Sequence, residues 1–133
     1  MRTWILALAL ASASLAACFS ANTPLGEIAT IKSLDLVMDN QATAIDPIFK
    51  KIGQAKFDDA ELAAITAASE RVQATSVKTK DFSKGTDFDA LTLKLSEKAK
   101  ALGDAAKAKD ATAINATLTD MKGLCKQCHS KFR

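Results

Sequence analysis

Apolar residues recur every three or four positions along almost the whole chain after residue 23. This period is typical of α-helices, and no run of alternating β-branched residues competes with it. The 133 residues include only 5 glycines and 2 prolines, so few positions interrupt the pattern. The sequence therefore predicts an all-α fold.

Four helical segments are predicted, over residues 23–53, 58–78, 87–107 and 111–132. Asp58, followed three residues later by Glu61, forms a variant of the capping box and marks the start of the second segment. Pro47 should kink or interrupt the first segment, and Gly53 can end it. Four helices of this length with short connections favour an antiparallel up-and-down four-helix bundle.

The fourth segment has the most regular apolar stripe. Its members are Ile114, Leu118, Met121, Cys125, Cys128 and Phe132. Their separations alternate between four and three residues, which is a heptad-like seam of the kind that packs at a shallow angle against neighbouring helices. Asp110 directly precedes the segment and is expected to cap it.

The N-terminus has the pattern of an export signal. Arg2 precedes an uncharged apolar run over residues 4–17, which is shorter than the ~20 residues that span a bilayer. A charged start, an apolar middle and a small-residue end are typical of a secretory signal peptide. We therefore expect residues 1–17 to be a signal peptide, 18–24 a tether and 25–133 a single folded domain.

The end of this signal predicts how the mature chain is held. Leu15, Ala16, Ala17 and Cys18 resemble the bacterial lipobox, in which a peptidase cuts before the cysteine and its thiol carries a lipid. Phe19, rather than Asp, follows the cysteine, so no inner-membrane retention signal is present. The prediction is a periplasmic protein anchored by a lipid at Cys18 in the inner leaflet of the outer membrane. The alternative is ordinary cleavage nearby, which leaves Cys18 as a spare thiol.

Two of the three cysteines and the only histidine lie within five residues, in the sequence CKQCH. On a helix, Cys125, Cys128 and His129 share one face because they are three and four residues apart. C-x-x-C-H is the attachment motif for c-type haem. Each thiol forms a thioether with one vinyl group of the porphyrin, and the adjacent histidine ligates the iron. The motif predicts one covalent haem c per chain.

Two other interpretations of this motif remain open. A C-x-x-C pair can be a thiol–disulfide centre, although such pairs usually open a helix and this one lies near the end of a predicted helix. A structural zinc site needs four ligands, and this motif supplies three with no second histidine in the chain.

The C-terminal sequence CKQCHSKFR resembles the ending of the cytochrome c-prime family, also called class II cytochromes c. In that family the C-x-x-C-H motif closes the fourth helix and is followed, after two residues, by an aromatic residue and Arg; here these are Phe132 and Arg133. The resemblance implies an antiparallel four-helix bundle with haem near one end, between the first and last helices. It also implies a distal residue on the first helix, where many members carry Arg shortly before it. In this chain the nearest basic residue is Lys32.

The sixth iron ligand has one candidate in the sequence. His129 is already used, Met1 leaves with the signal, and Met121 is on the same helix as His129. Met38 lies on the first segment, which the resemblance implies crosses the haem, so it is the candidate distal ligand. The alternative is that Met38 fills space in the core, as methionine in a helix stripe usually does. The distal side is then open or apolar, with Leu34 nearby.

These alternatives lead to different functions. Methionine and histidine together suit an electron carrier with a raised potential. An open site suits binding of nitric oxide or carbon monoxide, as in cytochrome c-prime proteins. A lipoprotein without haem is a third hypothesis. We expect no enzymatic activity, redox proteins as partners, and a homodimer as a further candidate assembly. A formal net charge of +3 with interleaved signs does not favour nucleic acid.

Overall fold

The computed structural model describes residues 22–133. The elements are η1 (Leu25–Thr30), α1 (Leu34–Phe49), α2 (Asp59–Thr79), η2 (Lys80–Phe82), α3 (Thr86–Lys107) and α4 (Ala111–Phe132). The signal peptide and the lipidated cysteine predicted at residues 1–18 lie outside these described residues. Within them, no strand is present, which confirms the all-α prediction.

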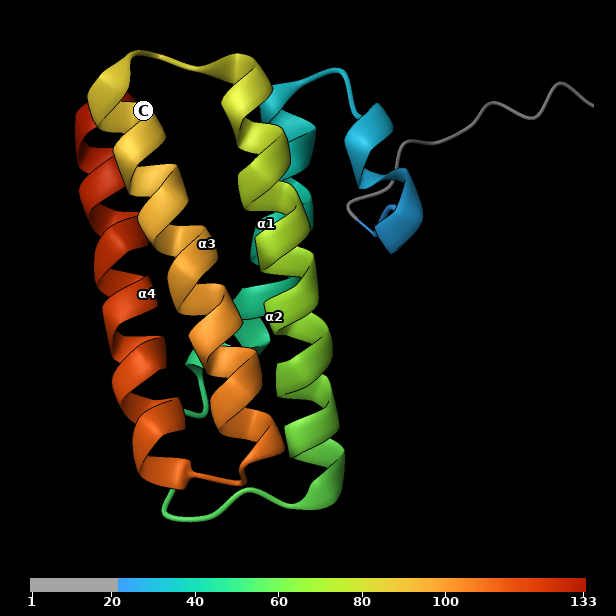
Figure 1. Cartoon of the computed structure of the whole chain (residues 1–133), viewed down its shortest axis with the longest axis vertical. Coiled ribbons are helices and arrows are strands. Elements are labelled where there is room, and N and C mark those ends of the chain that lie inside the picture. Colours follow the sequence, from blue (N-terminus) through green and yellow to red (C-terminus); the bar gives the residue numbers. More distant parts are fainter. Residues whose placement is uncertain (1–21) are drawn as a thin grey trace, which may run out of the picture.

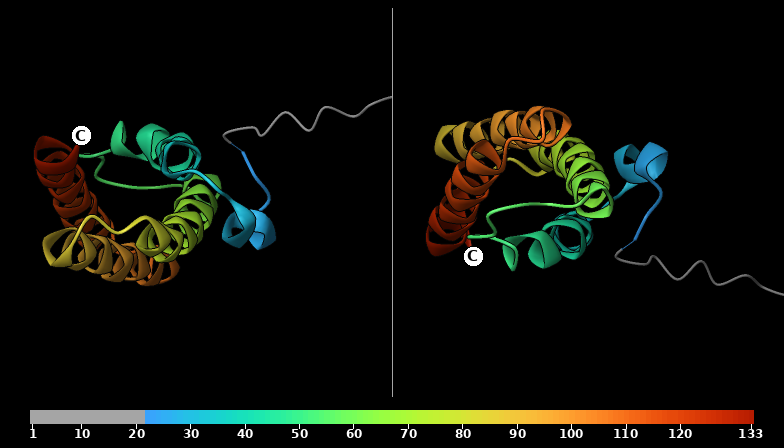
Figure 2. Two further views of the ribbon diagram at one scale, coloured as in Figure 1. Left: turned by 90° about the horizontal axis from the view of Figure 1, so that it is seen from above. Right: turned by 90° about the horizontal axis from the view of Figure 1, so that it is seen from below.

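The four long helices form an antiparallel up-and-down bundle (Figure 1). In that view α1 and α3 run downward, and α2 and α4 run upward. The C-terminal end of α4 therefore lies at the same end of the bundle as the start of α1. Seen end-on, η1 lies outside the bundle beside α2, on the far side from α4 (Figure 2).

The predicted start of the first segment at residue 23 was wrong, whereas its predicted interruption near Pro47 is present. The first part is the separate 3₁₀ helix η1, and α1 begins only at Leu34, where the side chain of Ser33 accepts a hydrogen bond from Leu36 N at 3.2 Å. The helix ends at Phe49, two residues after Pro47. Proline has no N–H to donate to the carbonyl of Thr43, four residues earlier, and its ring crowds that carbonyl, so it weakens the helix at this point. Gly53 then takes a positive φ of 97° in the following turn.

The other three helices start where the sequence predicts. Asp58 and Glu61 form a complete capping box: Glu61 N donates to Asp58 at 2.8 Å, and Asp58 N donates to Glu61 at 3.0 Å. Asp110 caps α4 by accepting from Ala113 N at 2.9 Å. Gly85, with a φ of 110°, directly precedes the first residue of α3.

The main hydrophobic core fills the lower half of the bundle, where α1 and α3 end and α2 and α4 begin. Its largest fully buried side chains are Ile65, Val72, Leu102, Ile114, Leu118 and Met121. The helices approach closely here: a Cβ atom added at Gly103 would lie 2.5 Å from Ser69 Oγ. The core side chains of this half are therefore shielded from water.

A smaller hydrophobic cluster joins η1 to the bundle. Ile28, Ile31 and Val37 are buried together, and Met38 packs against them. No helix of the described chain is long and apolar enough to cross a membrane.

Candidate functional site

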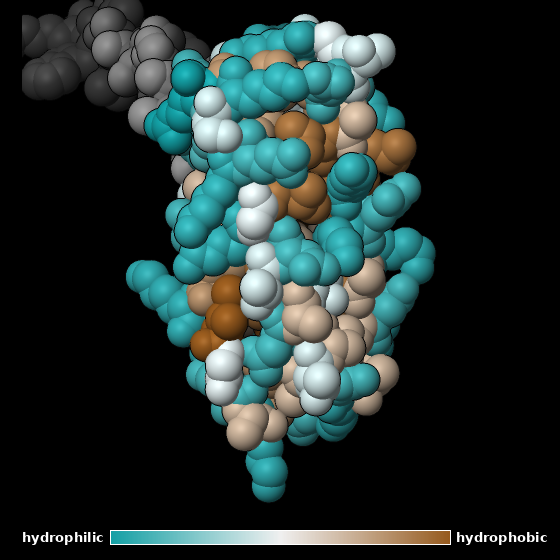
Figure 3. Space-filling view, turned by 90° about the vertical axis from the view of Figure 1, so that its left-hand side faces the viewer, coloured by the Kyte–Doolittle hydropathy of each residue, from teal (hydrophilic) through white to brown (hydrophobic). Residues whose placement is uncertain are grey.

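The upper half of the bundle contains a cavity of about 980 Å³, which borders the core at Ile45 and Leu95. All four long helices contribute to its walls. Figure 3 faces the side of the molecule on which α4 lies and shows hydrophobic side chains uncovered in the upper half, framed by hydrophilic ones. An apolar cavity of this size, open to solvent at its rim, is a binding site by default.

The α4 wall of the cavity carries the cysteine–histidine motif. Cys125, Cys128, His129 and Phe132 all line it. The seam of α4 is completely buried as far as Met121 and then becomes half-buried at Cys125 and Cys128. The structure therefore places both thiols and the only histidine on one wall, as the spacing predicts.

The protonation of the two thiols argues against a thiol–disulfide centre. Burial raises the pKa of Cys125 to about 11, with the carboxylate of Asp46 adding to the effect. Burial also raises the pKa of Cys128, against the opposing charge of Lys84. Reactive redox cysteines need a lowered pKa because the thiolate is the nucleophile. Among the described residues, neither cysteine forms a disulfide.

The zinc alternative also lacks support. Among residues 22–133, no group of three or more His, Cys, Asp or Glu side chains is arranged to hold a metal ion. The motif residues are therefore better suited to a group that bonds each thiol and the histidine at a different atom. A single metal ion would instead require all three side chains to coordinate it jointly.

The α1 wall faces α4 across the cavity. Its members are Leu34, Asp35, Met38, Asp39, Gln41, Ala42, Ile45, Asp46 and Phe49. Met38 lies on this wall, as the sequence analysis expects, and is half-buried. It also packs against the cluster of Ile28, Ile31 and Val37, so part of its side chain is engaged in the hydrophobic contact with η1.

Sequence reasoning missed a group of buried polar residues on the cavity wall. Gln41 lies on α1, Ser76 and Thr79 on α2, and Thr92 on α3, and all four are buried. A signal was present in the sequence: Ser69, Ser76 and Thr79 fall at the same helical spacing as the apolar stripe of α2. The helical period does not say whether such small polar side chains face a core or a cavity.

The last turn of α4 is held against the start of α3. The rings of Phe88 and Phe132 meet edge to face, with centroids 5.3 Å apart. Lys84 Nζ donates to the Phe132 carbonyl oxygen at 2.9 Å, and Lys131 forms an ion pair with Asp87. These contacts fix the position of the helix end that carries the motif.

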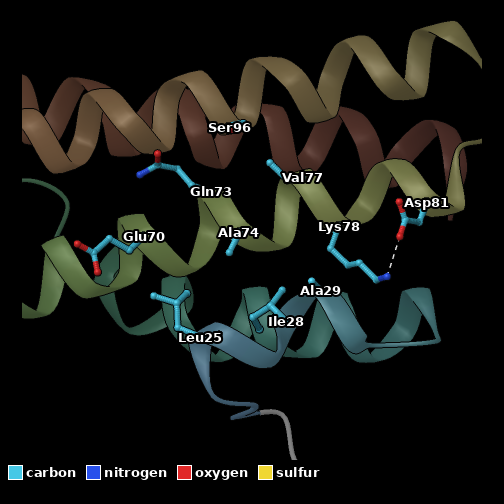
Figure 4. A pocket seen from close by; sticks show the side chains of 11 residues that line it. Leu25, Ile28, Ala29, Glu70, Gln73, Ala74, Val77, Lys78, Asp81 and Ser96 are labelled. Carbon is cyan, nitrogen blue, oxygen red and sulfur yellow. Dashed lines mark hydrogen bonds and ion pairs between the residues drawn. The ribbon is translucent and has the colours of Figure 1, made fainter.

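Another hollow, of about 640 Å³, lies between η1 and α2 (Figure 4). Its walls include Leu25, Ile28, Val77 and the ion pair of Lys78 with Asp81. It contains neither cysteine nor histidine. It therefore lacks the chemistry of the cavity at the upper end.

The residues of the upper cavity fit a haem attached through the C-x-x-C-H motif. The two thiols are unpaired, they lie on the wall of an apolar cavity, and the histidine is beside them on the same helix. The volume is at the upper end of the roughly 300–1,000 Å³ found for cofactor sites. The arrangement leaves room for a large flat group between α1 and α4.

Comparison with known proteins agrees with this geometry. A family model described as cytochrome C' (c-prime) matches residues 30–133. Searches of curated proteins and of solved structures gave no significant match. The matched region includes all four long helices and the C-terminal motif. The chain therefore belongs to the cytochrome c-prime family, and it is a c-type cytochrome that binds covalent haem c.

Proposed function

We propose that this protein is an electron carrier whose haem is attached at Cys125 and Cys128 and ligated by His129. The observation that carries the proposal is the placement of these three side chains on one wall of the cavity at the upper end of the bundle. Haem supplies an iron that changes oxidation state by one electron. No separate catalytic group is part of the proposal.

The chain's own residues would hold and shield the bound group. Two covalent links to α4 retain it in a small protein, and His129 follows directly in the same helical turn. Phe88, Leu91 and Leu95 of α3 form an apolar wall that excludes water from one side.

Cysteine substitutions test the attachment. Cys125→Ala and Cys128→Ala should each weaken covalent retention of haem, measured by haem staining of a denaturing gel. Ser130→Ala is a matched control because Ser130 is exposed and, within residues 22–133, its side chain bonds only to the Gln127 carbonyl, at 2.9 Å. Unchanged haem staining in both cysteine variants would contradict the proposed attachment.

Met38 is the proposed sixth ligand in the electron-carrier form, since it lines the cavity on the wall that faces α4. A second candidate function is binding of small gases at an open iron site. The packing of Met38 against Ile28, Ile31 and Val37 favours this second candidate, because a side chain held by η1 is less free to ligate the iron.

The optical spectrum with and without carbon monoxide separates the two candidate functions. A low-spin spectrum with a sulfur-to-iron band, unchanged by the gas, supports Met38 as the ligand, and a high-spin spectrum that shifts supports an open site.

The location and partners are part of the same proposal. A lipid on Cys18 would keep the protein in the periplasm at the outer membrane, and Cys18→Ser should release it from the membrane fraction. A wild-type protein that is already soluble would contradict the anchor. The cavity lining carries the basic side chains Lys84, Lys122, Lys126 and Arg133, and the acidic side chains Asp35, Asp39 and Asp46 lie on its α1 wall. We propose that the basic group contacts an acidic redox partner, so the rate of electron exchange should fall as salt is added.

A further inference from the structure

The wall of the upper cavity contains a polar pair that helix packing does not fully satisfy. Gln41 of α1 is 8% exposed and Ser76 of α2 is 1% exposed, and both line the cavity. Buried polar groups normally have hydrogen-bond partners, because an unpaired one loses water without compensation. What these two side chains bond to therefore indicates what the cavity is suited to hold.

The amide of Gln41 bridges two helices. Its Nε2 donates to Thr75 Oγ1 at 3.0 Å and makes a longer contact with Ser76 Oγ at 3.4 Å, so the amide nitrogen faces α2. Thr75 Oγ1 is in turn directed at its own helix, toward the carbonyl oxygens of Arg71 and Val72 at 2.9 and 3.1 Å. The bridge uses the donors of Gln41 and fixes the Ser76 oxygen as an acceptor.

Two polar groups on this wall have no hydrogen-bond partner among the described residues. The hydroxyl hydrogen of Ser76 has no acceptor, and Oε1 of Gln41 has no donor. The threonines on the same wall differ. Thr79 donates to the Thr75 carbonyl at 2.8 Å, and Thr92 donates to the Asp89 carbonyl at 2.9 Å. Ser76 is thus the one wall hydroxyl for which the described chain supplies no acceptor.

We propose that Gln41 and Ser76 form a polar subsite for a small iron ligand with an acceptor oxygen, such as a diatomic gas. Ser76 donates its hydroxyl hydrogen to the ligand, and Gln41 orients Ser76 by donating to its oxygen. This inference rests on the proposed haem attachment at α4 and deepens the gas-binding candidate. Gln41 lies one helical turn from Met38, on the α1 wall that faces the motif.

The subsite should change both the C–O stretching frequency of bound carbon monoxide and the affinity for it. A hydrogen bond to the far oxygen of bound carbon monoxide draws electrons from the iron onto the ligand and weakens its C–O bond. The C–O stretching frequency of the wild type should therefore be lower than that of a variant without the Ser76 hydroxyl. Loss of one neutral hydrogen bond should also weaken carbon monoxide binding by about fivefold.

The experiment uses the haem-loaded protein with carbon monoxide as the probe. Ser76→Ala should raise the C–O stretching frequency and weaken binding. Thr79→Val is the matched control, because Thr79 is a buried hydroxyl on the same wall that already bonds to its own helix. It should change neither quantity. Adding Gln41→Leu to Ser76→Ala should cause no further rise in frequency if Gln41 acts through Ser76.

The outcomes separate this inference from the proposed function. An identical C–O frequency in wild type and Ser76→Ala would overturn the subsite, and so would a wild type that keeps its haem but does not bind carbon monoxide. An equal rise with Thr79→Val would also overturn it, because the effect would then belong to general wall polarity. Absence of attached haem in the wild type would instead overturn the proposed attachment.

Discussion

The two halves of the bundle use the same helices for different purposes. In the lower half, Ile65, Leu102 and Leu118 are completely buried and the helices are closely packed. In the upper half the corresponding space is a cavity of about 980 Å³. One half supplies the folding free energy through burial of apolar surface, and the other keeps an apolar space open for a cofactor.

The seam of α4 runs through both halves without a change in spacing. Ile114, Leu118 and Met121 are core residues, whereas Cys125, Cys128 and Phe132 continue the seam as the wall of the cavity. The period of a helix therefore identifies an inward face but not what that face contacts. Only the change in residue type, from aliphatic to cysteine, marks the boundary.

The largest expected difference between the halves is in how much the free energy of unfolding falls when a leucine is truncated to alanine. Leu118→Ala should lower the free energy of unfolding by about 2–5 kcal/mol, since it creates an enclosed cavity in the packed half. Leu34→Ala, in the wall of the existing cavity, should cost about 1 kcal/mol or less. Urea unfolding of chains expressed without haem measures both. Equal costs would mean that the upper half collapses when haem is absent.

A second test concerns the close approach of α2 and α3 in the packed half. Gly103→Ala should destabilise the protein by about 1–3 kcal/mol, because the new Cβ would lie 2.5 Å from Ser69 Oγ. The double variant with Ser69→Ala should recover most of this loss, since the Ser69 Cβ is 3.4 Å away. Thermal unfolding of the two single variants and the double variant gives the coupling. Additive effects would show that the two residues do not contact each other.

The helix caps provide a smaller contrast between the ends. Asp58→Ala removes a complete capping box at the packed end and should cost about 1 kcal/mol. Ser33→Ala removes a single 3.2 Å hydrogen bond at the cavity end and should cost less. Denaturant midpoints rank the two variants, and the reverse order would indicate that α1 depends on its cap more than on packing.

The smallest effects are expected from surface ion pairs, one at each end. The hydrogen bond and charge of Lys131 lower the pKa of Asp87 below 3.8, and those of Lys109 do the same for Asp59. A lowered carboxylate pKa contributes stability that is present above the unfolded value and is lost as pH falls through the folded value. Asp87→Asn and Asp59→Asn should thus each be slightly less stable than wild type near neutral pH. The differences should vanish in acid and shrink with salt in thermal unfolding.

Local chemistry made much of the molecule predictable from the sequence. The capping box at Asp58, the cap at Asp110 and the seam of α4 are set by residues within one or two turns of each other, and all are present. The grouping of Cys125, Cys128 and His129 on one face follows from helix geometry in the same way.

The features that the sequence did not predict depend on contacts between distant segments. The break before α1 arises because η1 packs Ile28 and Ile31 against the bundle while Ser33 starts a new helix. The pair of Gln41 and Ser76 is 35 residues apart in the chain and meets only when α1 packs on α2. The role of Met38 stays a prediction. Core packing and iron ligation would both place it on the same face of α1, so its position does not distinguish them.

The position of η1 determines how an anchored molecule would face its surroundings. η1 lies on the far side of the bundle from α4 (Figure 2). The four residue steps from Cys18 to Asn22 span at most ~14 Å. The lipid proposed at Cys18 would therefore attach on the η1 side of the bundle, opposite the helix that carries the haem.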